Sequence, residues 1–261
     1  MTGDLALVGG GRMGAALVGG LLAAGWAPER LTVVEAVEGR RRELSEQFPG
    51  VRVVAEPAGG GGAVLAVKPG DVPAAASALA AAGVERVVSI AAGVRLAALE
   101  AALGRVPVVR AMPNTPALVG SGVTAIAPGS LAGEEDLAWA EEVLGAVGRV
   151  VRVGEPLLDA VTGLSGSGPA YVFLVAEALI DAGVLVGLPR DLSTTLAVQT
   201  LLGAARLLAE TGDTPEALRA AVTSPGGTTA AGLRALEAAG VRAAFLDAVT
   251  AATERSKELG G

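Results

Sequence analysis

The sequence predicts an α/β domain followed by an all-α domain, and three observations support this. Buried-type strand patterns alternate with helical patterns over the first half of the chain, as in a parallel, doubly wound sheet. A glycine-rich turn at residues 9–14 follows the first strand. Beyond residue 154 the strand patterns stop and only helical patterns continue. We therefore expect a Rossmann-like dinucleotide-binding domain over residues 1–154 and a helical domain over residues 155–261.

The elements of the first half follow one another in a regular order. Short apolar runs predict strands at residues 4–8, 31–35, 63–67, 87–90 and 106–110. Helical periodicity predicts helices between them at residues 13–24, 39–48, 71–82 and 95–103. In the second half, proline and glycine divide the pattern at residues 187–189, 212–215 and 224–227. Long helices are expected there at residues 169–186 and 190–208.

Composition excludes several classes of function. The chain has 261 residues, of which 51% are hydrophobic, enough for one large core or two modest ones. Its net charge of −7 provides no basic surface, so we expect no nucleic-acid partner. It contains neither cysteine nor histidine, which excludes disulfides, thiol chemistry and the usual zinc or iron sites. No metal site is expected.

The sequence also favours a cytoplasmic protein with no membrane partner. Glycine, proline or charge interrupts the apolar stretches short of the roughly 20 residues that a membrane span requires. Residues 1–8 run directly into a strand pattern, without the basic region and cleavage site of a signal peptide.

The strongest local signal is the turn formed by Gly9, Gly11 and Gly14, with Arg12 and Met13 inside it. In a dinucleotide-binding turn the first glycine permits the bend, the second lets the backbone approach the pyrophosphate, and the third lets helix pack on strand. An acid, Glu35, ends the next strand about 20 residues later, where it accepts hydrogen bonds from a ribose and repels a 2′-phosphate. This favours NADH. The arginines at residues 40–42 are close enough to reach a phosphate, although a solvated helix face is the simpler interpretation.

Three further loops at predicted strand ends are candidate cofactor contacts, because open α/β sheets bind ligands at their carboxyl edge. The first is Ala66-Val67-Lys68-Pro69, in which the proline stops the strand and places the lysine at the edge. The second contains Ala91 and Ala92, small enough to let a nicotinamide ring approach the backbone. The third holds Asn114 between two prolines, and it is interpreted equally well as a structural turn or a nicotinamide-facing loop.

A second glycine-rich helix start lies near the C-terminus, at Thr223-Ser224-Pro225-Gly226-Gly227-Thr228-Thr229. The free N–H groups and the positive dipole end of a helix N-terminus attract a carboxylate or phosphate. Two such starts in one chain indicate a cofactor at one and a small anionic substrate at the other. A capped hinge between two helices explains the segment equally well.

Taken together, these residues resemble the pyrroline-5-carboxylate reductase family. The matching segments follow the family's order along the whole chain: the Gly9–Gly14 turn, Ala66–Pro69, Met112–Pro116, Asp159–Tyr171, Gly187–Arg190 and Ser224–Thr229. The pair formed by Gly-Leu-Ser-Gly-Ser-Gly-Pro-Ala-Tyr and Ser-Pro-Gly-Gly-Thr-Thr is highly specific, whereas the nucleotide turn is shared by many unrelated enzymes.

The resemblance implies reduction of 1-pyrroline-5-carboxylate to L-proline, the last step of proline biosynthesis, with NADPH or NADH. It implies that the helical domain binds substrate through Gly226, Gly227, Thr228 and Thr229. Without histidine or cysteine, a hydroxyl or a water relayed by one is the natural proton route, so we expect Thr229 to be catalytic with Ser224 in support. Glu155 matches a family position near cofactor and substrate, although a helix N-terminal acid that complements the dipole is an equal interpretation.

The two long helices of the second half have apolar residues on nearly every face, which requires burial on more than one side. This predicts an obligate dimer through residues 155–261, and a compact monomeric bundle is the alternative. The resemblance implies the same homodimer through the C-terminal helices, with a decamer as the larger assembly.

Two other functions remain as alternatives. The first is a dehydrogenase of 6-phosphogluconate-like architecture, which relies on a lysine in the first long helix of its second domain. No lysine lies between residues 69 and 256, which argues against it. The second is a non-catalytic NAD(P)-binding regulator, against which the intact Ser-Pro-Gly-Gly-Thr-Thr segment argues.

Overall fold

The computed structural model describes residues 4–260, and its contacts divide the chain into two compact units. The first unit runs to Ser167 and also takes in the stretch that begins at Ala251. The second unit is Gly168–Thr250. The last strand ends at Arg152, so the first unit continues beyond the strand-containing part of the sequence.

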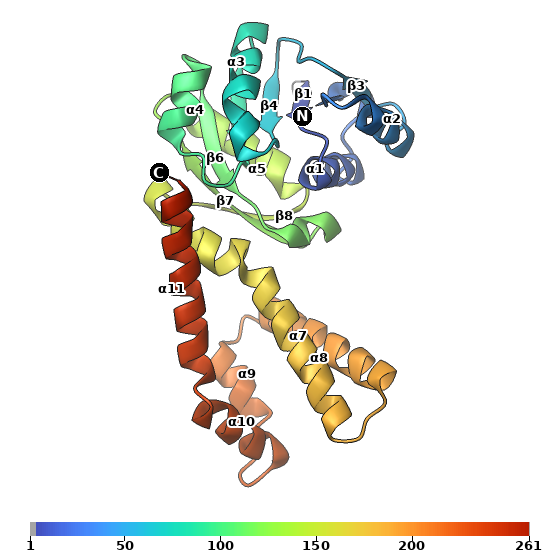
Figure 1. Cartoon of the computed structure of the whole chain (residues 1–261), viewed down its shortest axis with the longest axis vertical. Coiled ribbons are helices and arrows are strands. Elements are labelled where there is room, and N and C mark those ends of the chain that lie inside the picture. The colour runs from blue at the N-terminus through green and yellow to red at the C-terminus, as the bar shows by residue number, and fades with distance from the viewer. Residues whose placement is uncertain (1–3, 261) are drawn as a thin grey trace. The chain divides into compact units, whose positions relative to one another are not determined.

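An eight-stranded sheet forms the centre of the first unit, in the order β3-β2-β1-β4-β5-β6-β7-β8 (Figure 1). The strands are β1 (Leu5–Val8), β2 (Leu31–Val34), β3 (Arg52–Val54), β4 (Gly62–Leu65), β5 (Arg86–Ser89), β6 (Val108–Met112), β7 (Gly122–Pro128) and β8 (Gly148–Arg152). Strands β1 to β6 are parallel, β7 is antiparallel to β6, and β8 is parallel to β7. Strand order reverses between β1 and β4, the point at which sheets of this type bind ligands.

Helices cover both faces of this sheet, so the first unit has three layers. Its helices are α1 (Arg12–Ala23), α2 (Glu38–Gln47), α3 (Val72–Ala82), α4 (Leu96–Leu103), α5 (Glu134–Gly145) and α6 (Leu158–Val161). Apolar residues of α1, α2 and α5 share one core cluster with Val64 and Val88 of the sheet. Those of α3 and α4 share the other with the neighbouring Ala63 and Val87. Successive strand residues thus enter opposite cores, as the pleat requires.

All five predicted strands are present, but β3, β7 and β8 were missed. Strand β3 is only three residues long, and β8 is a largely exposed edge strand with two arginines and no apolar alternation. Strand β7 contains glycine, alanine and proline, which have low strand propensity, although most of it is buried. Its antiparallel direction is a departure from the fully parallel sheet that the alternation predicts.

The second unit is helical, with α7 (Gly168–Leu185), α8 (Arg190–Thr211), α9 (Pro215–Ala221), α10 (Thr228–Ala238) and the first part of α11 (Val241–Leu259). Helices α7 and α8 pack together where Ser193 Oγ donates to the carbonyl of Ile180 at 2.7 Å. A Cβ on Gly183 would lie 2.1 Å from that hydroxyl, so the glycine permits the close approach. Ser193 and Ala197 are the buried residues of this unit. The unit therefore has almost no core of its own.

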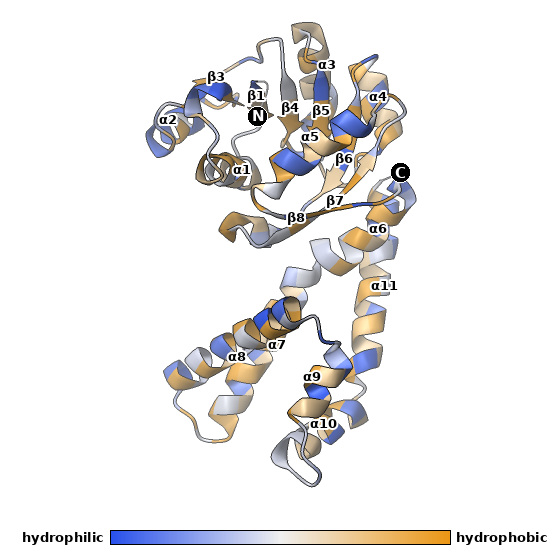
Figure 2. Cartoon of the chain, turned by 180° about the vertical axis from the view of Figure 1, so that it is seen from behind, coloured by the Kyte–Doolittle hydropathy of each residue, from blue (hydrophilic) through white to orange (hydrophobic). Residues whose placement is uncertain are grey.

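Hydrophobic residues, coloured orange in Figure 2, recur along α7 and α8. Those with exposed side chains include Val172, Phe173, Leu174, Leu185, Leu196, Val198 and Leu202. Among the described residues, two helical stretches, Glu155–Leu185 and Arg190–Thr211, are long and apolar enough to cross a membrane by length and composition. The expectation that every apolar stretch falls short of a span is therefore wrong here. One or two such helices are weak evidence of a membrane, because a subunit interface requires the same apolar surface.

Candidate active site

The glycine turn connects β1 to α1 and requires glycine at its two ends. Gly9 has φ +108°, and a Cβ there would lie 2.6 Å from the carbonyl oxygen of Ala66. A Cβ on Gly14 would lie 2.0 Å from the carbonyl oxygen of Gly9. On Gly11, by contrast, a Cβ would meet nothing within 4 Å. The turn is thus closed against the protein at Gly9 and Gly14 and open to solvent at Gly11, which fits a bound pyrophosphate.

Helix α1 begins at the open side of this turn. Gly11 is its N-cap and has no side chain with which to cap the first N–H groups. Arg12 is exposed at the first position, whereas Met13 packs against the core. These N–H groups and the helix dipole provide the attraction for a phosphate that the sequence predicts.

Glu35 follows β2 and turns back toward the glycine turn. Its Oε2 accepts a hydrogen bond from the N–H of Gly10 at 3.0 Å, and its Oε1 accepts one from the N–H of Val37 at 2.9 Å. Arg40 Nε donates to the carbonyl of Gly10 at 2.8 Å, and Arg41 Nη1 donates to the carbonyl of Glu35 at 2.9 Å. The carboxylate is therefore held at the edge of the predicted adenosine site, and both arginines bind to the protein itself.

The loop after β4 completes the floor of the turn. The N–H of Ala66 donates to the carbonyl of Val8 at 2.8 Å, so Ala66 continues the sheet against β1. Val67 is half-buried against the core formed by α3 and α4. Lys68 and Pro69 are exposed where a short 3₁₀ turn begins. The structure thus places Lys68 at the carboxyl edge, as the sequence predicts.

The loops after β5 and β6 reach the same edge. Ala91 is buried and Ala92 is exposed. The Asn114 side chain is held from both sides, because its Oδ1 accepts from the N–H of Val123 at 2.9 Å and its Nδ2 donates to the carbonyl of Ser165 at 3.2 Å. These bonds favour the structural turn for Asn114. A role in binding the cofactor stays a prediction.

The segment Thr162–Gly166, part of the Gly-Leu-Ser-Gly-Ser-Gly motif, forms a π-helix after α6. Thr162 Oγ1 donates to the carbonyl of Leu158 at 2.8 Å, and Ser165 Oγ donates to that of Val161 at 3.1 Å. A Cβ on Gly166 would lie 2.7 Å from the methyl group of Met112, so the motif packs closely on the end of β6. Single π-turns of this kind are frequent at functional sites.

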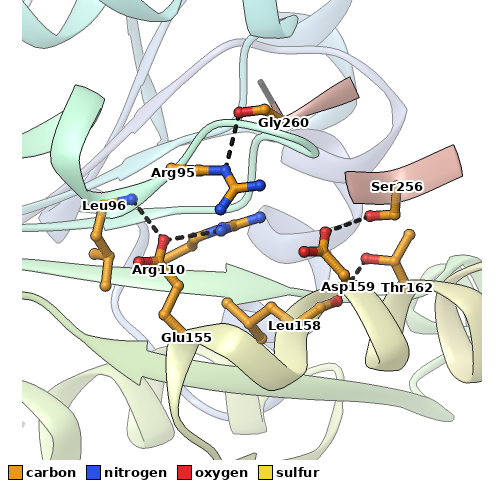
Figure 3. A network of polar contacts seen from close by, with 9 residues as sticks. All are labelled: Arg95, Leu96, Arg110, Glu155, Leu158, Asp159, Thr162, Ser256 and Gly260. Atoms are coloured by element: carbon orange, nitrogen blue, oxygen red, sulfur yellow. Dashed lines mark hydrogen bonds and ion pairs between the residues drawn. The ribbon is translucent and has the colours of Figure 1, made fainter. Parts of the chain in front are cut away.

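Glu155 begins the segment that leads to α6, and it connects three elements of the first unit (Figure 3). Its Oε1 accepts from the N–H of Leu96 at 2.7 Å and from Arg110 Nη1 at 2.8 Å. It thus complements the N-terminus of α4, a helix distant from it in sequence. Arg110 was not predicted to be a functional residue. Its charge within a buried strand is the feature of the sequence that could have indicated one.

The predicted substrate segment lies in the second unit, between α9 and α10. Gly226 has φ +72°, and a Cβ on Gly227 would lie 2.4 Å from Ser224 Oγ, so the turn requires both glycines. Gly227 is the N-cap of α10 and provides no side-chain cap. Thr228 and Thr229 are exposed at the first two helical positions.

An exposed ion-pair cluster joins α10 to α9 and α11 within the second unit. Glu237 on α10 bonds Arg242 of α11 at 2.8 Å and lies 4.0 Å from Arg219 of α9. The hydrogen bond from Arg242 lowers the pKa of the Glu237 carboxyl. The hydroxyl of Thr223 donates to the carbonyl of Arg219 at 2.6 Å, which connects the substrate segment to the same cluster.

The structure therefore brings together, at one edge of the sheet in the first unit, the residues predicted to bind cofactor: Gly9, Gly11, Arg12, Met13, Gly14, Glu35, Ala66, Val67, Lys68, Pro69, Ala91, Ala92 and Asn114. It groups Ser224, Gly226, Gly227, Thr228 and Thr229 at a single helix start of the second unit.

This fold and these sites define the chain as an NAD(P)-dependent oxidoreductase with a Rossmann-like domain and a helical dimerisation domain. Residues 4–93 match the family model described as NADP oxidoreductase coenzyme F420-dependent. Residues 155–259 match the model described as pyrroline-5-carboxylate reductase dimerisation. The chain belongs to the pyrroline-5-carboxylate reductase family.

Individual relatives match over their full length. The chain is 46% identical to the pyrroline-5-carboxylate reductase of Synechocystis, covering 100% of this chain and 99% of that protein. The structure of a pyrroline-5-carboxylate reductase from Coxiella burnetii superposes with a TM-score of 0.94 at 36% identity, and all of both chains is covered. The Plasmodium falciparum pyrroline carboxylate reductase, solved with NADP bound, gives a TM-score of 0.84 at 29% identity and covers 100% of this chain and 99% of that one.

Proposed function

We propose that the chain reduces 1-pyrroline-5-carboxylate to L-proline, the last step of proline biosynthesis, with NADPH or NADH. The observation that carries this proposal is the full-length match to named reductases. The intact pair of glycine-rich helix starts, one in each unit, supports it. The absence of lysine from residues 69–256 argues against a dehydrogenase of 6-phosphogluconate-like architecture, which relies on a lysine in its second domain.

The residues present fit a nicotinamide dinucleotide. The open helix start at Gly11 would hold the pyrophosphate, and Glu35 would accept from the adenosine ribose. The exposed loops at Lys68 and Ala92 would flank the nicotinamide half. When bound, the reduced cofactor supplies the hydride.

The helix start of α10 is proposed as the substrate site. The reaction adds a hydride to the imine carbon and leaves a proton on the ring nitrogen, while the nicotinamide is oxidised. The N–H groups at Gly227, Thr228 and Thr229 would hold the substrate carboxylate at the positive end of the helix dipole. The Thr229 hydroxyl would orient the ring nitrogen, and Ser224, which packs under Gly227, would keep the turn in shape. A hydroxyl is a poor acid, so Thr229 positions an iminium that is already protonated.

The domain boundary and the assembly belong to the same proposal. We assign residues 1–154 to nucleotide binding and residues 155–261 to dimerisation and substrate binding, which the family match over residues 155–259 supports. The chain is a homo-oligomer, and we propose a homodimer through its C-terminal helices that extends to a decamer. The exposed apolar surface of α7 and α8 would be buried between copies, so we propose a cytoplasmic protein without a membrane partner.

An assay with the purified full chain tests this function. Absorbance at the nicotinamide band should fall when NADH or NADPH is mixed with pyrroline-5-carboxylate, and proline should accumulate in equal amount. A non-catalytic regulator would bind the cofactor without turnover. Cofactor oxidation at the background rate with both nucleotides would rule the proposal out.

A further inference from the structure

A single carboxylate oxygen connects the N-terminus of α4 to strand β6 in the first unit. Glu155 Oε1 accepts from the N–H of Leu96 at 2.7 Å and from Arg110 Nη1 at 2.8 Å (Figure 3). Leu96 is the first residue of α4 and follows the loop that leaves β5. Arg110 is on β6 and pairs in register with Ser89, the last residue of β5.

The surroundings of Arg110 make this connection difficult to replace. Its side chain is 8% exposed, whereas that of Glu155 is 30% exposed. A buried guanidinium without a partner is costly, so the position of Arg110 depends on an anion at this point. The carboxylate also lies at the N-terminus of α4, where the positive end of the helix dipole favours a negative charge.

Both sides of the connection are held by further bonds. Beside Leu96, Arg95 Nε donates to the carbonyl of Gly260 at 2.9 Å. One turn after Glu155, Asp159 Oδ1 accepts from the hydroxyl of Ser256, which is buried, at 2.7 Å. The segment that carries Glu155 is thus fixed to α11, and Glu155 has little freedom to follow a displaced loop.

The two loops that Glu155 holds follow β5 and β6. They lie at the carboxyl edge of the sheet, beside β4. Ala91 and Ala92 lie between β5 and Leu96, and Met112 ends β6 two residues beyond Arg110. Hydride transfer depends steeply on the position of the reacting atoms, and a displacement of about 1 Å can cost about 100-fold in rate. A residue that sets these loops therefore acts on the chemical step without touching the reacting atoms.

We propose that Glu155 is a positioning residue for hydride transfer, which fixes the β5 and β6 loops through Leu96 and Arg110. This rests on the proposed reductase function, in which those loops flank the nicotinamide. It replaces direct substrate contact as the role of Glu155.

Glu100 offers a matched control. It lies on α4, the helix whose first N–H donates to Glu155. Its Oε1 accepts from the N–H of Ser130 at 2.5 Å, so it makes the same kind of bond to a loop. Ser130 follows β7, which is antiparallel to β6, so this loop lies at the opposite edge of the sheet. Removing either glutamate frees one backbone N–H, but only Glu155 also pairs with Arg110 and lies near the predicted nicotinamide loops.

The experiment compares the full chain with Glu155→Ala, Glu155→Gln, Glu155→Asp and Glu100→Ala. We measure kcat and KM for pyrroline-5-carboxylate, NADH affinity, NADH fluorescence at saturation, and amide exchange at Leu96 and Ser130. Glu155→Ala should lower kcat about 10- to 100-fold, leave NADH affinity within about threefold, and change the bound nicotinamide fluorescence. Exchange at Leu96 should accelerate in this variant. In Glu100→Ala only exchange at Ser130 should change.

The conservative variants separate geometry from charge. Glutamine retains one oxygen at the same reach, whereas aspartate retains the charge on a shorter side chain. Glu155→Gln keeps the reach but loses the charge that Arg110 requires, and Glu155→Asp keeps the charge but loses reach, so both should give kcat between those of Glu155→Ala and wild type. These two variants decide the matter if Glu155→Ala does not fold. Equal kcat and equal nicotinamide fluorescence in Glu155→Ala and Glu100→Ala would overturn the proposal, as would wild-type kcat in both conservative variants. If the wild-type chain shows no turnover, the proposed reductase function is wrong. In that case the fluorescence of bound NADH in the variants alone decides whether Glu155 positions the nicotinamide site.

Discussion

The two hydroxyls proposed to serve the reaction, those of Thr229 and Ser224, have different surroundings. Ser224 packs under the backbone of Gly227, and its carbonyl accepts from the N–H of that residue at 3.0 Å. Thr229 is exposed on the first turn of α10, where a substrate held by the helix start would meet it. Both residues are exposed, so Thr229 is assigned to the ring nitrogen because of its place on the first turn of α10.

Replacing Thr229 by valine keeps the shape and removes the hydroxyl. We expect Thr229→Val to lower kcat by about 10- to 1,000-fold, roughly 1.4 to 4 kcal/mol, because the hydroxyl interacts more strongly with the transition state than with the ground state. Steady-state kinetics with saturating NADH checks this. Thr223→Val is the control, since that hydroxyl donates to the carbonyl of Arg219. If Thr229→Val changes KM alone, the residue only binds substrate.

Glu35 is predicted to determine the choice between cofactors. Its carboxylate is held by the N–H groups of Gly10 and Val37, where it would repel a 2′-phosphate. We expect wild-type kcat/KM to be higher with NADH than with NADPH, and Glu35→Gln to shift the ratio toward NADPH by about tenfold. Glu38→Gln serves as the control, because Glu38 pairs with Arg42 on the exposed side of α2. A wild-type preference for NADPH would show that the arginines dominate.

At the scale of single residues, the sequence predicted local turns better than bonds between distant residues. The glycine turn was predictable because a Cβ at Gly9 or Gly14 would meet the neighbouring backbone, so its spacing has local structural causes. The bonds of Asn114 and Glu155 were not, since both join residues distant in sequence whose pairing only the sheet topology determines. The predicted substrate contact of Glu155 came from the resemblance alone.

At the scale of the element, an acid-sensitive ion pair joins α10 to α11. The hydrogen bond from Arg242 lowers the pKa of Glu237 in the folded protein. A lowered folded-state pKa contributes stability that is present above the ordinary glutamate pKa of about 4.3 and lost as pH falls through the folded value. We expect Glu237→Gln to lower the Tm at pH 7, and the difference from wild type to shrink below roughly pH 4.

Circular dichroism melts at fixed protein concentration measure this. Glu210→Gln is the control, because Glu210 pairs with Arg206 of its own helix at an exposed position. Its effect should be smaller, since a pair within one helix connects no elements. A Glu237→Gln difference that is constant from pH 7 to pH 3 would contradict the assignment.

Most elements with a strong pattern were predicted, although the 12-residue helix α5 was missed together with the weakly patterned strands. Helices α1 and α4 begin within one residue of their predicted starts, because glycine and arginine mark the boundary before each apolar run. Strands β3 and β8 are short or half-exposed, and their stability comes from pairing with a neighbouring strand rather than from their own sequence. Such strands are visible only once the sheet exists.

At the scale of the whole molecule, the second unit requires a partner. Phe173 is 63% exposed in the single chain, and many apolar neighbours on α7 and α8 are also exposed. We expect Phe173→Asp to shift the full chain toward smaller species, measured by analytical ultracentrifugation, because a charge at an apolar interface is costly. Val37→Asp is the matched control, since Val37 is 62% exposed but lies in the first unit. Equal sedimentation of both variants would place the interface elsewhere.

In the proposed reaction, hydride passes from nicotinamide to the imine carbon of pyrroline-5-carboxylate. NADH that carries deuterium at both C4 positions tests this directly, since either face of the nicotinamide then delivers a deuteride. Mass spectrometry of the product from the full chain should show proline with one deuterium, located by NMR at the former imine carbon. Unlabelled proline, or no proline while the chain binds NADH, would contradict the account.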